Sequence, residues 1–320
     1  MDSCGLSFIT GFNVKIKIPD RLEFIPHMWA AQRDTDASLQ GKLCVISGAT
    51  SGVGLASLKR IAAGGADVVL VARNRSKAED ARSAIASASH VNIDTVVADF
   101  TDLDSVRSAA GRILEKYSRI DLLINSAGVF STRKVITPGG FELCFCVNHL
   151  GPFLLTRLLL DRIVESAPAR IIQVNSQGHR FGGFNINDVN WERRFYNGYR
   201  GYGASKTAQL LTIWELADRL KGTRVTVNAV HPGGVKTNIG NNNGPLYRWF
   251  SRYIIWYTLK DPRMSGDAIY FLAAAPELSN VSGRYFNRTI DERPAPHARN
   301  RELGRAVWEL SEMLLGLTAF

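Results

Sequence analysis

Cysteine is scarce in this chain of 320 residues, which has only Cys4, Cys44, Cys144 and Cys146. Cys44 lies in an apolar run, where we expect a buried thiol. Cys144 and Cys146 form a C-x-C pair that is too close for easy mutual bridging and has no second pair with which to bind zinc. The sequence therefore predicts reduced thiols, as in a cytosolic protein, and predicts neither a disulfide framework nor a metal site.

Long hydrophobic runs are also absent. No window reaches about 18 uninterrupted apolar residues, the length that a membrane-spanning helix needs. The first residues, MDSCGLSFITGFNVKIKIPD, are apolar only in short, interrupted stretches and match neither a signal peptide nor a span. We therefore expect a cytoplasmic protein, and the sequence leaves a peripheral membrane contact and a homo-oligomer open.

Basic residues outnumber acidic ones but form no run of five or more. The net charge is +10, and the Lys and Arg residues are scattered through both halves of the chain. Because no basic recognition helix is present, the sequence argues against nucleic acid as a partner. A phosphorylated cofactor or an anionic membrane surface would use the positive charge equally well.

Short apolar runs alternate with helical patterns from about residue 40 onward. The expected strands lie within 43–46, 66–73, 92–100, 119–128, 169–176, 224–233 and 282–286. The expected helices lie within 53–64, 76–88, 102–117 and 139–166, around Tyr202, and within 300–316. This order predicts an α/β fold of the Rossmann type, a doubly wound parallel sheet with helices on both faces in a single domain.

The pattern also suggests three segments. Residues 1–40 show no clear period and are interpreted as an N-terminal extension. Residues 41–290 form the expected dinucleotide-binding catalytic domain, including a substrate cover at about 240–265. Residues 291–320 form the expected C-terminal helical tail.

The segment SGATSGVG follows an expected strand and opens an expected helix. Small residues there let the backbone approach a pyrophosphate, and the helix N-terminus supplies amide donors. A purely structural turn is the alternative. The expected cofactor contacts are Ser47, Gly48, Ser51, Gly52, Val53 and Gly54.

The end of the second strand reads VARNRSK, with Arg73, Arg75 and Lys77 and no acidic residue before Glu79. An acidic residue there would bind the ribose 2′-hydroxyl of NAD, whereas arginine can accept the 2′-phosphate of NADP. We therefore predict NADP(H) as the cofactor, with NAD(H) less favoured, at Arg73 and Lys77. A solvated charge cluster is the alternative.

Two further strand ends suit a cofactor. Asp99 follows the third strand and could receive the adenine amino group. Asn125, Ala127 and Gly128 belong to NSAG at the end of the fourth strand, where small residues would let the cofactor lie against backbone. Plain turns at strand ends are the alternative for both.

Tyr202 and Lys206 stand four residues apart in GYGASK, so they share one helix face. An ammonium near a phenol favours the phenolate, which predicts a lowered pKa for Tyr202 and a phenol able to transfer protons. The small residues Gly203, Ala204 and Ser205 are expected to leave room for a ribose and nicotinamide. Taken alone, the pair could also belong to an ordinary surface helix.

Together these residues resemble the short-chain dehydrogenase/reductase family, in its compact branch and its retinol-dehydrogenase-like members. The motifs occur in family order over roughly residues 40–290, and they are SGATSGVG, NSAG, VNHLGPF, IIQVNSQGH, YGASK and HPGGVKT. The resemblance implies that Tyr202 is the general acid, that Lys206 holds the nicotinamide ribose, that Ser176 binds the substrate oxygen and that Asn148 anchors a water.

HPGGVKT, residues 231–237, would close over the nicotinamide amide in such a protein. The contacts implied there are Pro232, Gly233, Val235 and Thr237. A plain loop is the alternative.

The segment GPLYRWFSRYIIWYTL, residues 244–259, is rich in aromatic and aliphatic side chains. By resemblance it covers the substrate, which implies a lipophilic carbonyl or alcohol; an ordinary core helix is the alternative. The predicted activity is interconversion of such a carbonyl and its alcohol by hydride transfer. A non-catalytic cofactor-binding scaffold and a C=C reductase on the same fold remain the rival functions.

The cofactor assignment gives a direct prediction. Because Arg73 and Lys77 can neutralise a 2′-phosphate, we expect the apparent dissociation constant for NADPH to be lower than that for NADH. Titration of both nucleotides, followed by protein fluorescence, measures this. A clear preference for NADH would contradict the assignment.

Overall fold

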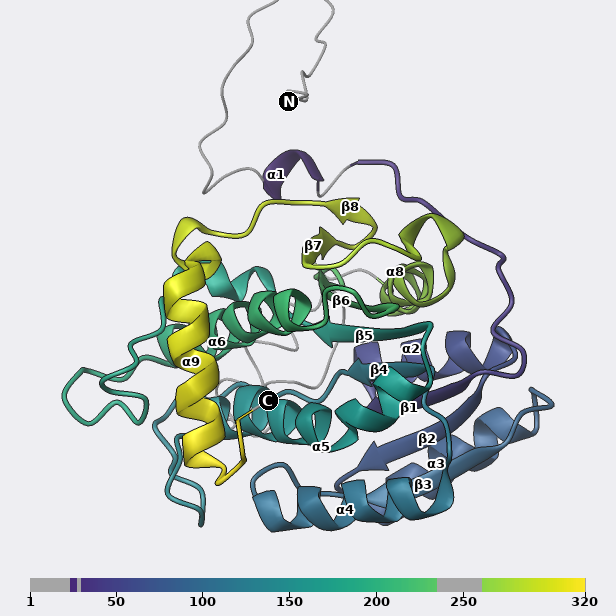
Figure 1. Ribbon diagram of the computed structural model, residues 1–320, viewed down its shortest axis with the longest axis horizontal. Helices are drawn as coiled ribbons and strands as arrows, with labels where there is room; N and C mark the ends of the chain where they lie inside the picture. The colour runs from purple at the N-terminus through teal and green to yellow at the C-terminus, as the bar shows by residue number, and fades with distance from the viewer. Residues whose placement is uncertain (1–23, 28–29, 235–260, 320) are drawn as a thin grey trace, which may run out of the picture.

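The computed structural model describes residues 24–27, 30–234 and 261–319. Its centre is one eight-stranded sheet in the order β3-β2-β1-β4-β5-β6-β7-β8 (Figure 1). The strands are β1 (Leu43–Ser47), β2 (Asp67–Ala72), β3 (Ile93–Val97), β4 (Leu122–Asn125), β5 (Ala169–Val174), β6 (Val225–His231), β7 (Arg284–Asn287) and β8 (Ile290–Asp291). All neighbours pair in parallel except β7 and β8, which are antiparallel.

The strands are apolar along most of their length because helices cover both faces of the sheet. Chain order leaves β1 towards β2 and β3 on one side and resumes with β4 on the other side of β1. The carboxyl ends of β1 and β4 are in register, with Ser47 opposite Asn125. In open α/β sheets, ligands bind at the carboxyl ends of the two strands between which the strand order reverses.

Two apolar layers hold the helices on the sheet. The first layer includes side chains from α2 (Gly52–Ala63), α3 (Arg75–Ala86) and α8 (Arg263–Ala274). The second includes side chains from α4 (Leu103–Lys116), α5 (Gly151–Glu165), α6 (Gly198–Arg219) and α9 (Arg301–Leu314). Helix α9 packs against α6, so residues late in the chain buttress the helix that carries Tyr202 (Figure 1).

The helix expected over 139–166 is interrupted. Gly140 has φ +82° in a turn, and a six-residue π-helix, η1 (Phe145–Leu150), precedes α5. Pro152 lacks the N–H that would bind the Asn148 carbonyl in an α-helix, and its ring would clash with that carbonyl. The backbone widens instead, so that the Gly151 N–H donates to the Cys146 carbonyl. The continuous helix was therefore wrong at its N-terminal part.

The predicted doubly wound α/β fold is confirmed. The sequence did not predict three elements, which are the short helix α1 (Phe24–His27), the helix α8 and the two-residue strand β8. Cys44, Cys144 and Cys146 are buried free thiols. The domain limits stay a prediction, and residues 240–260 of the expected substrate cover lie outside the described part of the chain.

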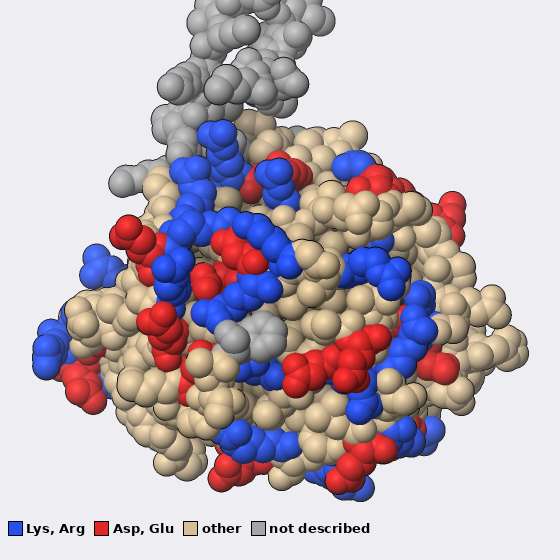
Figure 2. Space-filling model, viewed as in Figure 1, with Lys and Arg blue, Asp and Glu red and all other residues tan. Residues whose placement is uncertain are grey.

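Within the described ranges, no helix combines the length and the hydropathy that crossing a membrane requires. Lys and Arg side chains are interleaved with Asp and Glu over the face shown in Figure 2.

Two helical glycines give a matched test of packing. A Cβ on Gly266 of α8 would lie 2.7 Å from the Ala56 carbonyl oxygen of α2, whereas a Cβ on Gly111 of α4 would meet nothing within 4 Å. We expect Gly266→Ala to lower the free energy of unfolding by about 1–3 kcal/mol through overpacking. Gly111→Ala should raise it by about 0.5–1 kcal/mol. Urea unfolding of both variants measures this, and equal effects would contradict the described packing.

Candidate active site

The glycine-rich turn after β1 brings two stretches of backbone together. Gly48 has φ +70°, and a Cβ on it would lie 2.4 Å from the Cα of Ala127. The Ala127 N–H donates to Ser47 Oγ at 3.4 Å. A Cβ on Gly54 would lie 2.3 Å from the Gly48 carbonyl oxygen, so this glycine seats α2 against the turn. The SGATSGVG and NSAG motifs therefore meet at one sheet edge.

The N-terminus of α2 opens beside this turn. Ser51 precedes the helix in an extended conformation, and its side chain does not cap the first amides of α2. Gly52 has φ +54°, and the first turn of α2 contains no acidic residue. Because the first amides of a helix need acceptors and carry partial positive charge, this end is suited to a phosphate.

The expected 2′-phosphate residues lie at the end of β2. Arg73, Arg75 and Lys77 are exposed, and Asn74 caps α3 by accepting a hydrogen bond from the Lys77 N–H at 2.9 Å. Among the residues that the structure describes, neither Arg73 nor Lys77 belongs to an ion pair. Asp99, after β3, accepts hydrogen bonds through Oδ1 from the backbone and hydroxyl of Thr101.

Ser176 and Tyr202 meet at the carboxyl edge of β5. Ser176 starts the short helix η2 (Gln177–Phe181), and its Oγ accepts a hydrogen bond from the Gly178 N–H at 3.1 Å. The Ser176 hydroxyl and the Tyr202 ring of α6 both lie beside Gly178, because a Cβ on that glycine would lie 3.4 Å from Ser176 Oγ and 2.7 Å from Tyr202 Cε1. The serine is thus a turn cap that lies next to the phenol ring. Phe130 packs edge-on against the Tyr202 ring, with 5.7 Å between ring centroids.

Burial dominates the electrostatics of the Tyr-Lys pair. It raises the pKa of Tyr202 to about 12, against the opposing effect of the Ser176 hydrogen bond. Burial also lowers the pKa of Lys206 to about 7, and the Nζ atom donates to the Val174 carbonyl at 3.1 Å. The expected lowering of the Tyr202 pKa is not found in the protein itself, because burial raises this pKa by more than any neighbouring group lowers it.

The small residues around Tyr202 have a different role from the one expected. A Cβ on Gly203 would lie 2.8 Å from the Gly182 backbone nitrogen, and a Cβ on Gly182 would lie 2.7 Å from the Ala204 nitrogen. Space that we assigned to a ribose beside Gly203 is therefore filled by backbone. This contact brings the chain that follows Ser176 against α6.

Asn148, in the π-helix η1, forms hydrogen bonds to two other segments of the site. Its Nδ2 donates to the Val129 carbonyl at 3.0 Å and to Ser205 Oγ at 2.9 Å, and its Oδ1 accepts from the Val129 N–H at 2.7 Å. Its carbonyl, left without a helical donor by Pro152, accepts from Gln209 Nε2. Asn148 therefore joins the loop after β4 to α6.

Sequence reasoning missed four residues around these groups, which are Gly178, His179, Asn175 and Gln209. Gly178 packs under the phenol, since a Cβ there would lie 2.7 Å from Tyr202 Cε1. His179 Nδ1 donates to the Ser176 carbonyl at 2.7 Å while its Nε2 accepts from the Ala295 N–H at 3.1 Å. Asn175 Nδ2 donates to Gln209 Oε1 at 2.9 Å. For Gly178 and His179 the sequence held one signal, which is the position of QGH directly after Ser176.

The loop after β6 supplies the last expected contacts. Pro232 is buried, and its carbonyl accepts from Ser265 Oγ at 2.8 Å. Gly233 follows with φ +97°. Val235 and Thr237 lie outside the described residues. The site thus collects Ser47, Asn125, Asn148, Ser176, Tyr202, Lys206 and Pro232 from separate parts of the chain.

Comparison with known families settles the relationship: residues 42–246 match the short chain dehydrogenase family. The chain belongs to this family. It is therefore an oxidoreductase of the short-chain type, and the family uses a nicotinamide cofactor.

Several relatives of this short-chain dehydrogenase are similar over most of their length. Retinol dehydrogenase 13 from Homo sapiens is 40% identical over 290 residues, covering 88% of this chain and 87% of its own. Retinol dehydrogenase 14 from Homo sapiens is 38% identical, covering 91% and 92%.

Solved structures are similar as well. An uncharacterised protein from Mycobacterium paratuberculosis has a TM-score of 0.71 at 29% identity, covering 88% of this chain and 96% of its own. A short chain dehydrogenase from Burkholderia cenocepacia in complex with NADP has a TM-score of 0.62 at 24% identity, covering 78% and 96%. The latter similarity shows the fold alone.

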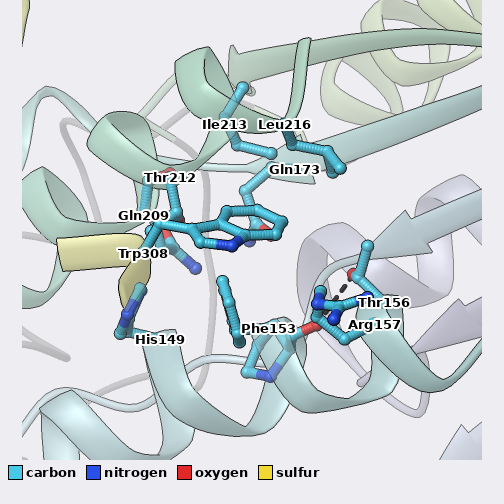
Figure 3. A pocket seen from close by; sticks show the side chains of 11 residues that line it. His149, Phe153, Thr156, Arg157, Gln173, Gln209, Thr212, Ile213, Leu216 and Trp308 are labelled. Carbon is cyan, nitrogen blue, oxygen red and sulfur yellow. Dashed lines mark hydrogen bonds between the residues drawn. The ribbon is translucent and has the colours of Figure 1, made fainter. Parts of the chain in front are cut away.

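A small cavity lies behind the site, between α5, α6 and α9 (Figure 3). Its lining includes His149, Gln209 and Trp308, and the indole ring of Trp308 packs edge-on against Phe153 with 4.7 Å between centroids. With about 20 Å³ it holds roughly one water molecule. It is therefore too small to be the substrate pocket of this short-chain dehydrogenase.

Buried histidines predict acid sensitivity. Burial lowers the pKa of His149 and of His179 to about 3, and that of His231 to about 4. Each binds its proton more tightly in the unfolded chain, so stability falls as the pH drops below about 6.5 and goes on falling towards the folded-state values. At about pH 5 the loss reaches up to about 2 kcal/mol per histidine.

His149→Gln should reduce the slope of the unfolding free energy against pH by the contribution of one proton, because glutamine does not titrate. The exposed His90 is the matched control, and His90→Gln should leave the slope unchanged. Urea unfolding at about pH 7 and about pH 5 measures both. Equal losses in the His149 variant and the parent protein would contradict the titration of His149.

Proposed function

We propose that the protein interconverts a lipophilic carbonyl compound and its alcohol with NADP(H), with Tyr202 as proton donor and acceptor. The observation that carries this proposal is the placing of Ser176 Oγ and the Tyr202 ring on either side of Gly178, at the same sheet edge as the glycine-rich turn. Lys206 lies one helical turn beyond Tyr202, with its Nζ 5.7 Å from the phenol ring centroid.

The residues around the turn fit a nicotinamide dinucleotide. Gly48 and Ala127 meet without side-chain bulk, and the uncapped first amides of α2 suit the pyrophosphate. The exposed Arg73 and Lys77 would bind the 2′-phosphate, which supports NADP(H) over NAD(H). When bound, such a cofactor supplies or accepts the hydride at the carbonyl carbon.

The protein supplies the proton for the oxygen. With a pKa of about 12, Tyr202 is a neutral phenol at physiological pH, the form that donates a proton to a carbonyl oxygen during reduction. Ser176 would donate a second hydrogen bond to that oxygen and stabilise its developing negative charge. In oxidation Tyr202 would take the alcohol proton instead.

Lys206 would regulate this transfer. Its pKa of about 7 means that it can gain a proton and charge near neutral pH. Contact with ribose hydroxyls and phosphates would favour the ammonium, which would then lower the pKa of the neighbouring phenol. The lowered Tyr202 pKa that the sequence suggested thus becomes a property of the complex.

The substrate class is the second part of the proposal. Phe130 lies beside the phenol, and the neighbouring Tyr199 packs on Phe130 with 5.4 Å between ring centroids. These apolar rings would receive an apolar substrate, in keeping with the names of the retinol dehydrogenases that resemble this chain. Location in the cytoplasm and peripheral contact with a membrane remain predictions.

Tyr202→Phe tests the proton role. We expect turnover of NADPH with lipophilic aldehydes or ketones to fall by a factor of about 10²–10⁴, because the donor is lost. Binding of NADPH should persist, since the ring stays. Tyr117→Phe, which removes a hydroxyl bonded to Asp94 near the amino end of the sheet, is the matched control and should retain activity.

Three outcomes separate the alternatives. Substantial residual turnover in Tyr202→Phe would contradict the proton-donor role. Cofactor binding by the parent protein with no turnover on any aldehyde, ketone or enone would favour the scaffold. Turnover confined to enones, with the C=C bond reduced, would favour the C=C reductase.

A further inference from the structure

A buried carboxylate lies behind the turn that begins at Ser176. Glu292 follows β8, and its side chain is fully buried. Its Oε1 accepts hydrogen bonds from Gln177 Nε2 and Arg180 Nη2, both at 2.7 Å. Its Oε2 accepts from His27 Nδ1 at 2.9 Å and from Asn287 Nδ2 at 2.8 Å. Four donors from three segments, two of them far away in the sequence, thus converge on one side chain.

Two of those donors belong to η2, the turn that follows Ser176. Gln177 and Arg180 are also joined to each other, since Arg180 Nε donates to Gln177 Oε1 at 2.6 Å. Gly178, between them, donates to Ser176 Oγ and lies under the Tyr202 ring. A shift of this turn would therefore move both the serine hydroxyl and the support of the phenol.

The other side of Glu292 is fastened to the N-terminal segment. His27 of α1 contacts Glu292, and its carbonyl accepts from Arg288 Nη2 at 3.0 Å. Further along, the Arg33 N–H donates to Thr289 Oγ1 at 2.8 Å. The described part of residues 1–40, which the sequence suggested is an N-terminal extension, is therefore hydrogen-bonded to the turn between β7 and β8.

A gain in folding stability does not by itself explain the buried ion pair of Arg180 and Glu292. The Arg180 and Glu292 side chains are 3% and 0% exposed, and removing two charges from water offsets most of their attraction. Burial by itself would raise the pKa of Glu292, yet hydrogen bonds from Gln177, Asn287, Arg180 and His27 hold it below its ordinary value. The carboxylate is thus ionised at neutral pH and fixes its donors in one geometry.

We propose that Glu292 is a positioning residue for the reaction: through Gln177 and Arg180 it holds the Ser176 turn against Tyr202, with His27 completing its set of donors. This rests on the proposed function, in which Ser176 binds the substrate oxygen. Catalytic groups must be placed closely, and a displacement of about 1 Å can lower the rate about 100-fold.

Glu292→Gln tests the proposal with little change of volume. The new amide N–H would face a donor, so at least one of the links is lost. We expect kcat to fall about tenfold or more, while KM for NADPH changes by less than about threefold, because the glycine-rich turn is untouched.

Glu312→Gln is the matched control. Glu312 of α9 forms a comparably buried ion pair with Arg157 of α5, with 3.0 Å between the closest N and O atoms and side chains 8% and 10% exposed. Arg157 also donates to the Thr318 carbonyl at 3.0 Å and lies over the Trp308 ring, so this pair joins α5 to the C-terminal segment. Its loss should lower the unfolding temperature but leave kcat within about twofold. A Glu292→Gln variant with kcat within about twofold of the parent protein would overturn the proposal.

Hydrogen exchange separates this proposal from the proposed function. In protein without substrate, the backbone amides of residues 177–181 should exchange faster in Glu292→Gln than in Glu312→Gln. Equal exchange there would overturn the positioning role, whatever the activity. If the parent protein turns over no carbonyl, the proposed function fails, while faster exchange in Glu292→Gln would still support the hold of Glu292 on the turn.

A milder variant covers the case in which Glu292→Gln does not fold. Gln177→Met removes the hydrogen bond from Gln177 to Glu292 and the one that Gln177 accepts from Arg180 Nε, and it keeps the Arg180–Glu292 charges paired. We expect a fall in kcat of about fivefold with faster exchange at residues 177–181. Unchanged kcat and exchange would overturn the proposal.

Discussion

Backbone contact between Gly182 and Gly203 is the constraint on which the site depends. Because neither residue has a side chain, the loop after η2 lies directly against α6, and Ser176 is held on the same side of Gly178 as the Tyr202 ring. A methyl group at either position would lie under 3 Å from backbone atoms. Backbone atoms can give way far less than a flexible side chain, so packing constrains the geometry of the candidate site.

The polar groups then work in partly buried surroundings, where Lys206 is buried and Ser176 and Tyr202 are half-buried. Desolvation makes Tyr202 a weaker acid and Lys206 a weaker base than they are in water. This leaves the phenol protonated and the amine poised near neutrality, and it makes both sensitive to charges brought by a ligand. The hydrogen bonds of Asn148, His179 and Glu292 are directional, and they hold the surrounding backbone in place when the charge of Lys206 changes.

Predictions from sequence succeeded where a local pattern has one physical solution. Apolar runs that alternate with amphipathic stretches require a parallel sheet covered on both faces, and the order of the motifs indicated the family. They failed where distant residues decide. The π-helix at Phe145–Leu150 follows from Pro152, but the donor that satisfies the Asn148 carbonyl, Gln209, lies far along the chain.

The sequence by itself determined the fold class, the glycine-rich turn and the helix face shared by Tyr202 and Lys206, because periodicity and short-range geometry fix all three. Only the tertiary structure decided the ionisation of that pair and the joining of His27 and Glu292 to the Ser176 turn. Burial and hydrogen-bond partners depend on which segments meet in space, and no local pattern contains that information.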